Sequence, residues 1–447
     1  MKIAIVGGGI MGMTLGYVLA SRGLSVHVFE QSAVLGGLAG PTVLEDGTEV
    51  DRFYHAILSS DDHLRSLCEE LGIADQLRFR PTRTGVFIRG GMHQMSNIWQ
   101  FLTFSALRPV DRLRLGLTIF SAQRTREWQS LETQNLEQYL IARGGRQLFQ
   151  DFWKPMLNAK FDGQYGNVPA TWMWSRFVRT ASSRSGVQKQ ELTGHLIGGY
   201  ATLMKAMADG IIRRGGQVHL QTTVREIVMN GPHVAGVRLD GDVRPYDQVV
   251  VTAPMPVAAR LMPGAPPAYL DDLTAFRYLG IVCPLLVLSR PLSEYWVTNI
   301  ADSSVPLTGV IETTAYIDPQ YVGGHHLVYA PKYTAPDSRW MRASDQEIRS
   351  VWLSALKRIF PTMEPDTVRQ FVVHRERLVE PLREAGSTRS VPSFETPIEG
   401  LHLVTTAQIY PALTNGESVT RHARGAAAHI VEALGRRTAA ASPRPAA

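Results

Sequence analysis

Three glycines near the start of the chain have the spacing of a phosphate-binding turn. The stretch reads Gly7-Gly8-Gly9-Ile10-Met11-Gly12. In this spacing Gly7 permits a tight turn, Gly9 lets the backbone approach a pyrophosphate, and Gly12 lets a helix pack closely on a strand. A helix that begins at Ile10 presents free backbone N–H groups, including those of Ile10 and Met11, to negative charge. The motif predicts a site that holds phosphate groups mainly through backbone atoms.

The elements around these glycines must place them at the end of a strand. Residues 2–6 are apolar and predict a buried parallel strand, residues 10–21 predict a helix, and residues 24–29 predict a second strand. The second strand ends at Glu30, which lies 18 residues past Gly12. A carboxylate there accepts hydrogen bonds from ribose hydroxyls, and an acid argues against a 2′-phosphate. Strand, turn, helix, strand and acid in this order predict a dinucleotide-binding unit.

The residues after Glu30 distinguish between dinucleotides. Gln31 begins a short spacer that leads to the turn Gly36-Gly37-Leu38-Ala39. From here the chain resembles the superfamily of flavin amine oxidases, protoporphyrinogen oxidases and phytoene desaturases, which also includes UDP-galactopyranose mutases. The resemblance implies that the cofactor is FAD and that this turn lies along its pyrophosphate. Many members have an arginine directly after the paired glycines, where this chain has Leu38.

The resemblance extends over most of the chain and implies further FAD contacts. It implies a segment at residues 50–55 that passes over the flavin and a helix at residues 420–434 whose amino terminus faces the flavin pyrimidine. A helix amino terminus stabilises the negative charge of reduced flavin. Many members have Gly-Asp after the last strand, where this chain has Thr405 and Thr406. The residues implied to contact FAD beyond the glycine turns and Glu30 are His55, Val224, Thr252, Gln408, Glu417, Ser418 and Val419.

The predicted fold class is α/β, with a discontinuous Rossmann-like FAD-binding domain and two inserts. The FAD-binding domain is expected at residues 1–60, 195–260 and 391–435. A mainly helical insert occupies residues 61–194, and a β-rich substrate domain of mixed α+β structure occupies residues 261–390. Within the helical insert the sequence predicts a hairpin at residues 85–95 that turns at Gly90-Gly91, a helix from Ser96 to Ala106, and a helix over residues 136–152. Residues 436–447 are rich in Ala, Pro and Arg and predict a disordered tail.

Hydride transfer to flavin N5 needs few protein groups, because the protein mainly orients the substrate and excludes water. The predicted catalytic residues are His55 and Tyr410, with Glu417 as a further candidate. Lys160 could reach the substrate, but a surface position is favoured. Cys68 and Cys283 are far apart in sequence and are interpreted as core thiols, so neither a metal site nor covalent attachment of FAD is expected.

Two enzymatic functions fit this pattern. The favoured one is an oxidase or dehydrogenase that transfers hydride from a small or lipidic biosynthetic substrate to FAD, with oxygen or a quinone as an undetermined electron acceptor. The alternative is a redox-neutral mutase that works with reduced flavin. A noncatalytic flavin-binding scaffold is the least favoured. Basic residues of the inserts lie mostly at spacings suited to outer faces, which predicts a hydrophobic cavity and favours oxidation.

The composition and charge of the chain limit the classes of binding partner that are expected. The chain has 447 residues and a net charge of +6, but its arginines are scattered and match no nucleic-acid motif. No run of ~18 apolar residues predicts a membrane span, so a cytoplasmic protein is expected. Between residues 107 and 126, arginines alternate with leucines. This segment is either a core helix with a solvated basic face or an amphipathic patch that contacts the inner membrane peripherally.

Overall fold

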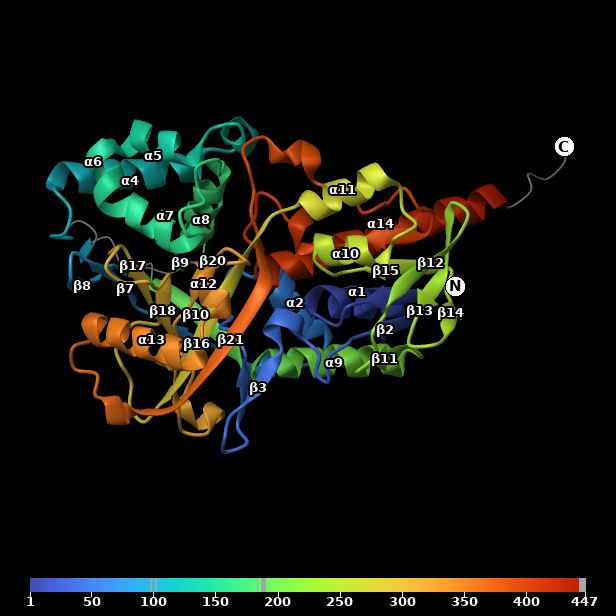
Figure 1. Cartoon of the computed structure of the whole chain (residues 1–447), viewed down its shortest axis with the longest axis horizontal. Helices are drawn as coiled ribbons and strands as arrows, with labels where there is room; N and C mark the ends of the chain where they lie inside the picture. Colours follow the sequence, from blue (N-terminus) through green and yellow to red (C-terminus); the bar gives the residue numbers. More distant parts are fainter. Residues whose placement is uncertain (97–98, 101–102, 183, 186–189, 442–447) are drawn as a thin grey trace.

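One lobe is built on a parallel sheet whose strands come from distant parts of the sequence (Figure 1). In the computed structural model, which describes residues 1–96, 99–100, 103–182, 184–185 and 190–441, this sheet has five strands in the order β11-β2-β1-β15-β22. The strands are β1 (Lys2–Val6), β2 (Ser25–Phe29), β11 (Gln217–His219), β15 (Gln248–Val251) and β22 (Leu401–Leu403). Because all neighbouring pairs are parallel, the carboxyl ends meet at one edge. Successive strands are added on opposite sides of β1, and ligands bind at such a reversal point.

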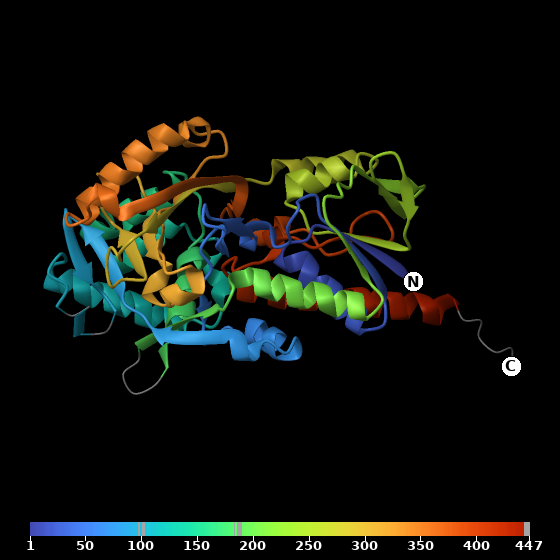
Figure 2. The same ribbon diagram turned by 90° about the horizontal axis from the view of Figure 1, so that it is seen from below.

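Both faces of this sheet are covered, which explains why β1 is apolar and buried from Ile3 to Val6. Ile3 and Ile5 pack against a layer of helices, while Ala4 and Val6 face a small antiparallel sheet. The helices are α1 (Ile10–Ser21), α9 (Gly199–Arg213) and α14 (Gly416–Ala441). Helix α1 packs between the other two, as Figure 1 shows, and Figure 2 shows the same layer from the side of α9. The second face carries β12 (Glu226–Asn230), β13 (His233–Arg238), β14 (Val243–Pro245) and α10 (Met255–Leu261), with α11 (Pro267–Ala275) against α10.

The other lobe is built on a larger, mostly antiparallel sheet. Among the described residues it has eight strands, in the order β20-β16-β19-β18-β17-β7-β8 with β21 also paired to β16. They are β7 (Thr84–Ile88), β8 (Gly91–Gln94), β16 (Tyr278–Leu288), β17 (Val297–Ile300), β18 (Gly309–Glu312), β19 (His326–Tyr329), β20 (Lys332–Thr334) and β21 (Val368–Pro381). One face packs against α12 (Arg339–Arg342) and α13 (Asp345–Ile359). The opposite face packs on Leu44, Val50 and Phe53, which belong to the predicted FAD-binding part.

A group of helices packs beside this sheet at the upper left of Figure 1. They are α4 (Pro109–Arg124), α5 (Leu136–Gly144), α6 (Arg146–Leu148), α7 (Lys154–Phe161) and α8 (Thr171–Ser182). Smaller elements connect the lobes: β3 (Pro41–Val43) with β4 (Glu49–Asp51), α2 (Asp62–Glu70), and a sheet of β5 (Ile57–Leu58), β6 (Leu77–Pro81), β9 (Arg184–Ser185) and β10 (Gln190–Leu196).

The predicted α/β class with a discontinuous parallel sheet is confirmed, and so is the hairpin that turns at Gly90-Gly91. That hairpin joins the sheet of the second insert, because β7 pairs in parallel with β17. A single helix over residues 136–152 was expected, but Gly145 has a φ of +84° and divides it. Helix α14 continues to Ala441, within the segment predicted to be a tail. Part of the helix expected from Ser96 to Ala106 lies outside the described residues.

Candidate functional site

The glycine turn has the geometry that its sequence predicts. Gly7 has a φ of +115°, in the region that favours glycine, and a Cβ on Gly12 would lie 2.0 Å from the carbonyl oxygen of Gly7. A Cβ on Gly9, in contrast, would meet nothing closer than 3.8 Å. No side chain caps the amino terminus of α1, which begins at Ile10. Free N–H groups beside an open glycine are the features that a pyrophosphate requires.

Glu30 and the second glycine turn close around this loop. The Glu30 side chain is buried, and its carboxylate accepts the N–H of Gly8 at 2.7 Å and the N–H of Ser32 at 2.8 Å. The N–H of Gly36 donates to the carbonyl oxygen of Gly8 at 2.8 Å. Gly37 also has a positive φ, of +57°. The two glycine turns and the acid therefore form one continuous backbone cradle that fits an FAD pyrophosphate and ribose.

Other predicted FAD contacts lie around the same edge of the sheet. The Thr252 hydroxyl donates to the carbonyl oxygen of Val6 at 2.9 Å. The N–H of Thr222 donates to the carbonyl oxygen of Glu30 at 2.9 Å, which brings the segment before Val224 beside the acid. Val224 and Ala39 are buried, Leu38 is half-buried, and Gln31 is exposed. The structure thus gathers residues from three distant segments beside the cradle, and their contacts with FAD stay predictions.

The predicted flavin helix begins at the junction of the two lobes (Figure 1). Asn415 and Ser418 cap it reciprocally: the Asn415 side chain accepts the Ser418 N–H at 3.0 Å, and the Ser418 hydroxyl accepts the Asn415 N–H at 3.1 Å. The Glu417 carboxylate accepts the N–H groups of His63 and Leu64, at the start of α2. These side chains are engaged in hydrogen bonds within the protein. A flavin at the start of α14 would therefore be contacted by backbone N–H groups.

Gln408 and Val419 support the same region from within. The Gln408 amide accepts the Thr405 N–H at 2.8 Å and donates to the carbonyl oxygens of Ser393 and Leu403, each at 2.9 Å. Val419 is buried in the core of the first lobe. Gln408 therefore braces the loop between β22 and α14 with hydrogen bonds inside the protein.

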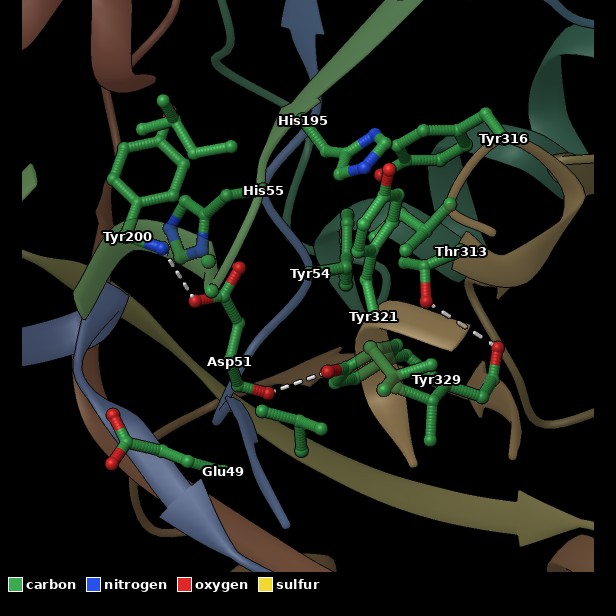
Figure 3. Close-up of a pocket in the computed structure, with 17 residues that line it drawn as sticks. Glu49, Asp51, Tyr54, His55, His195, Tyr200, Thr313, Tyr316, Tyr321 and Tyr329 are labelled. Atoms are coloured by element: carbon green, nitrogen blue, oxygen red, sulfur yellow. Dashed lines mark hydrogen bonds between the residues drawn. The ribbon is translucent and has the colours of Figure 1, made fainter. Parts of the chain in front are cut away.

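His55 lies in a polar and aromatic cavity between the lobes (Figure 3). Its Nδ1 lies 2.9 Å from the carbonyl oxygen of Phe53, and its ring centroid lies 5.1 Å from that of Tyr200. Burial lowers the pKa of His55 to about 4. The imidazole is therefore neutral at pH 7. If Nδ1 carries the proton and donates to Phe53, Nε2 is left as an acceptor.

Asp51 and His195 also line the cavity. The carboxylate of Asp51 accepts the Tyr200 N–H at 2.9 Å, and burial raises the pKa of Asp51 to about 7. His195 is 5% exposed, and neither ring nitrogen has a hydrogen-bond partner among the described residues. Burial lowers the pKa of His195 to about 4. Tyrosines complete the wall: Tyr54, Tyr200, Tyr316, Tyr321 and Tyr329.

Tyr410 lies away from the residues that line this cavity. Its hydroxyl is 2.7 Å from that of Thr171, the first residue of α8, and its ring packs edge-on against Trp128. The Arg383 guanidinium lies 5.4 Å from the Tyr410 ring. The two predicted catalytic residues thus belong to different parts of the lobe junction.

Sequence reasoning missed a buried ionic cluster beside Tyr54. Glu380 on β21 forms ion pairs with Lys160 of α7 and with Arg176 of α8, the latter at 3.6 Å. The Lys160 ammonium also lies 3.4 Å from the centroid of the Tyr333 ring. The preference for a surface lysine was wrong, because the Lys160 side chain is only 15% exposed. The sequence carried one signal of this burial, because Lys160 directly precedes the apolar Phe161, which lies in the core.

Among the described residues no cluster of three or more His, Cys, Asp or Glu side chains is suited to a metal ion. Cys68 and Cys283 are buried free thiols, as predicted. No helix in the described ranges is long and apolar enough to cross a membrane.

Comparison with known proteins identifies the architecture. The family model described as flavin containing amine oxidoreductase matches residues 10–431. The chain belongs to this family. It is 22% identical to a zeta-carotene desaturase from Arabidopsis thaliana over 74% of this chain and 62% of the relative, so it spans less than two thirds of that protein.

Solved structures show the same fold. An oxidoreductase from Methanosarcina mazei superimposes with a TM-score of 0.75 at 19% identity, covering 97% of this chain and all of the other. A reduced UDP-galactopyranose mutase superimposes with a TM-score of 0.76 at 14% identity, covering 97% and 96% of the two chains. The family model describes flavin-containing oxidoreductases, which supports FAD as the cofactor of this chain. The cradle described above fits that cofactor.

Proposed function

We propose that this protein oxidises a small or lipidic substrate by transferring hydride to FAD and works from the oxidised cofactor. The observation that carries the proposal is a polar and aromatic cavity lined by Asp51, Tyr54 and His55, in a segment whose Arg52 N–H donates to the carbonyl oxygen of Gly40 at 3.0 Å, just after the second glycine turn. Such a cavity excludes water and favours hydride transfer. When bound, FAD accepts the hydride at N5. A desaturase among the relatives supports an apolar substrate.

The protein's own residues orient the substrate and receive a proton. In this proposal the neutral imidazole of His55 positions the substrate through Nε2 or accepts its proton. Because the pKa of His55 is about 4, it is a weak base, and orientation is the role that its surroundings favour. If His55 is the base, His55→Ala lowers the rate of flavin reduction by about 10²-fold or more. His55→Gln, which keeps a hydrogen-bonding group, recovers activity only if the residue orients.

Turnover with oxidised holoenzyme tests the proposal. Substrates are first sought by anaerobic bleaching of the flavin and then by reoxidation with oxygen or a quinone. The proposal expects product without added reductant, at a higher oxidation state than the substrate. Product that forms only after reduction with dithionite, at an unchanged oxidation state, would contradict it and establish a mutase-like reaction.

A lipidic substrate also gives a role to one face of α4. Its buried face includes Leu115, Thr118 and Ala122, whereas the opposite face is apolar and exposed. The exposed apolar residues of α4 are Val110 (46%), Leu113 (63%), Leu117 (57%) and Phe120 (50%), and Trp99 (73%), ten positions before the helix, is also exposed. Exposed arginines flank them: Arg108, Arg114, Arg124 and Arg126. The neighbouring acid, Asp111, is buried and paired with Arg108. We propose that this face docks on an anionic membrane, where apolar insertion and basic charge act together.

Sedimentation with liposomes tests the docking face. Wild-type protein is expected to co-sediment with vesicles of phosphatidylcholine and phosphatidylglycerol and to be released from them by salt. It is not expected to co-sediment with vesicles of phosphatidylcholine alone. Replacing Leu113 and Leu117 by serine should lower partitioning about tenfold or more. Ile212→Ser on α9, which is also exposed (55%), is the matched control. Equal behaviour of wild type and the double variant would leave a solvated basic helix as the explanation.

A further inference from the structure

Arg383, just after β21, is a buried cation without a carboxylate partner. The residue is 8% exposed, and among the described residues no carboxylate lies within 4.0 Å of its guanidinium. Its Nη1 has no hydrogen-bond partner there, and its Nη2 donates to the carbonyl oxygen of Ile409 at 3.4 Å. The rings of Phe276 and Tyr410 lie 5.2 and 5.4 Å from it. Burial lowers the pKa of Arg383 to about 10, which leaves the side chain charged at neutral pH.

These contacts do not offset the cost of burying the charge. A buried ion is strongly destabilising unless it is paired and hydrogen-bonded. An aromatic face offsets only part of that cost, and one long bond to a backbone carbonyl adds little. A guanidinium presents two parallel N–H groups that match a carboxylate or a phosphate. The environment of Arg383 therefore lacks one component, an anion.

Arg383 lies near a buried cluster of charged residues from β21, α7 and α8. Glu380, three residues earlier, already pairs with both Lys160 and Arg176. Tyr410, beside Arg383, hydrogen-bonds to Thr171 on the helix that carries Arg176. Glu380 therefore already has two cationic partners and is not among the groups that pair with Arg383. Lys160, Arg176 and Arg383 are buried or half-buried exceptions to the expectation that basic residues of the inserts lie mostly on outer faces.

We propose that Arg383 anchors an anion site and binds the carboxylate of an amphiphilic substrate, an inference that rests on the proposed oxidation of a small or lipidic compound. One unpaired guanidinium balances a single negative charge, which favours a carboxylate over a doubly charged phosphate. The flanking rings of Phe276 and Tyr410 suit an apolar body attached to that carboxylate.

Binding of benzoate to the oxidised holoenzyme tests this site, with benzamide as the uncharged analogue. Both are titrated while the flavin absorption spectrum and the melting temperature are recorded. Benzoate is expected to shift both signals saturably and benzamide is not. Arg383→Gln should weaken benzoate binding about 10- to 100-fold, and Arg383→Lys should lie between, because lysine cannot bind bidentately. The exposed Arg377 on β21 supplies the control, Arg377→Gln, which should behave like wild type.

Two results would overturn the proposal. One is benzoate binding that is absent in wild type or unchanged in Arg383→Gln. The other is a loss of FAD affinity in Arg383→Gln with unchanged benzoate binding, which would assign the guanidinium to a phosphate of the cofactor. A merely structural arginine would lower the melting temperature of the apoprotein when replaced, whereas removal of an unpaired buried charge should raise it. Failure of the oxidation proposal is separate, because it would show as absent turnover with benzoate binding intact.

Discussion

Replacing Glu30 by alanine should weaken FAD binding by a predictable amount. Its carboxylate accepts two backbone N–H groups, from Gly8 at 2.7 Å and from Ser32 at 2.8 Å, and faces the position expected for the ribose. A hydrogen bond to a charged group contributes about 1.5–3 kcal/mol. Loss of one such bond from the complex raises the dissociation constant of FAD about 10- to 150-fold. Glu30→Gln keeps an acceptor but loses the charge, so its effect should be smaller.

The assay is a titration of apoprotein with FAD, in which binding is measured as quenching of flavin fluorescence. Glu69→Ala, which removes an exposed acid from α2 in the same lobe, is the control. The melting temperature of the apoprotein reports separately on any disorder of the glycine loop. A dissociation constant that is the same for wild type and Glu30→Ala would refute the placement of the ribose beside this carboxylate.

Three further outcomes follow from particular contacts. Ser418→Pro removes the N–H that Asn415 accepts and disturbs the start of α14, so reduced anionic flavin should lose about 1 kcal/mol of stabilisation. A lower reduction potential of the flavin is expected. An unchanged potential in folded protein would count against this geometry. Glu380→Gln leaves two cations unpaired and should destabilise the fold by about 3–5 kcal/mol in urea unfolding, whereas Glu294→Gln, from an exposed pair, should cost less than about 1 kcal/mol. Burial raises the pKa of Asp51 from 3.8 to about 7, so between these values the folded state binds more protons than the unfolded state. The stability of wild type relative to Asp51→Asn should therefore fall as pH rises from about 4 to 7, and a flat or rising difference would contradict the burial of this carboxyl.

The cofactor half of the structure could be predicted because its signals are local. Helix α1 begins at Ile10 and ends at Ser21 as its sequence predicts, since glycine spacing and apolar runs specify backbone geometry within a few residues. The hydrogen bond from Gly8 to Glu30 was not anticipated, but it joins residues that the motif had already singled out.

The substrate half could not be predicted in the same way, because its contacts join residues far apart in sequence. Helical spacing shows which residues share a face of α7 or α8, but not that this face meets β21. Lys160 and Glu380 are separated by 220 positions, and no periodicity relates them. Arg383 lies outside any regular element and gave no signal at all. Gly145 has a positive φ and divides α5 from α6. A glycine at this position was a visible signal in the sequence, and the prediction of a single helix took no account of it.

The central claim is that the cradle formed by Gly7, Gly9, Gly12 and Glu30 holds FAD. Its most direct test is identification of the cofactor that protein purified without added flavin releases on denaturation. The structure predicts yellow protein that releases FAD in amounts comparable to the chain, without proteolysis, as expected for noncovalent binding. Release of FMN or NAD alone, or failure to take up FAD on reconstitution, would contradict it.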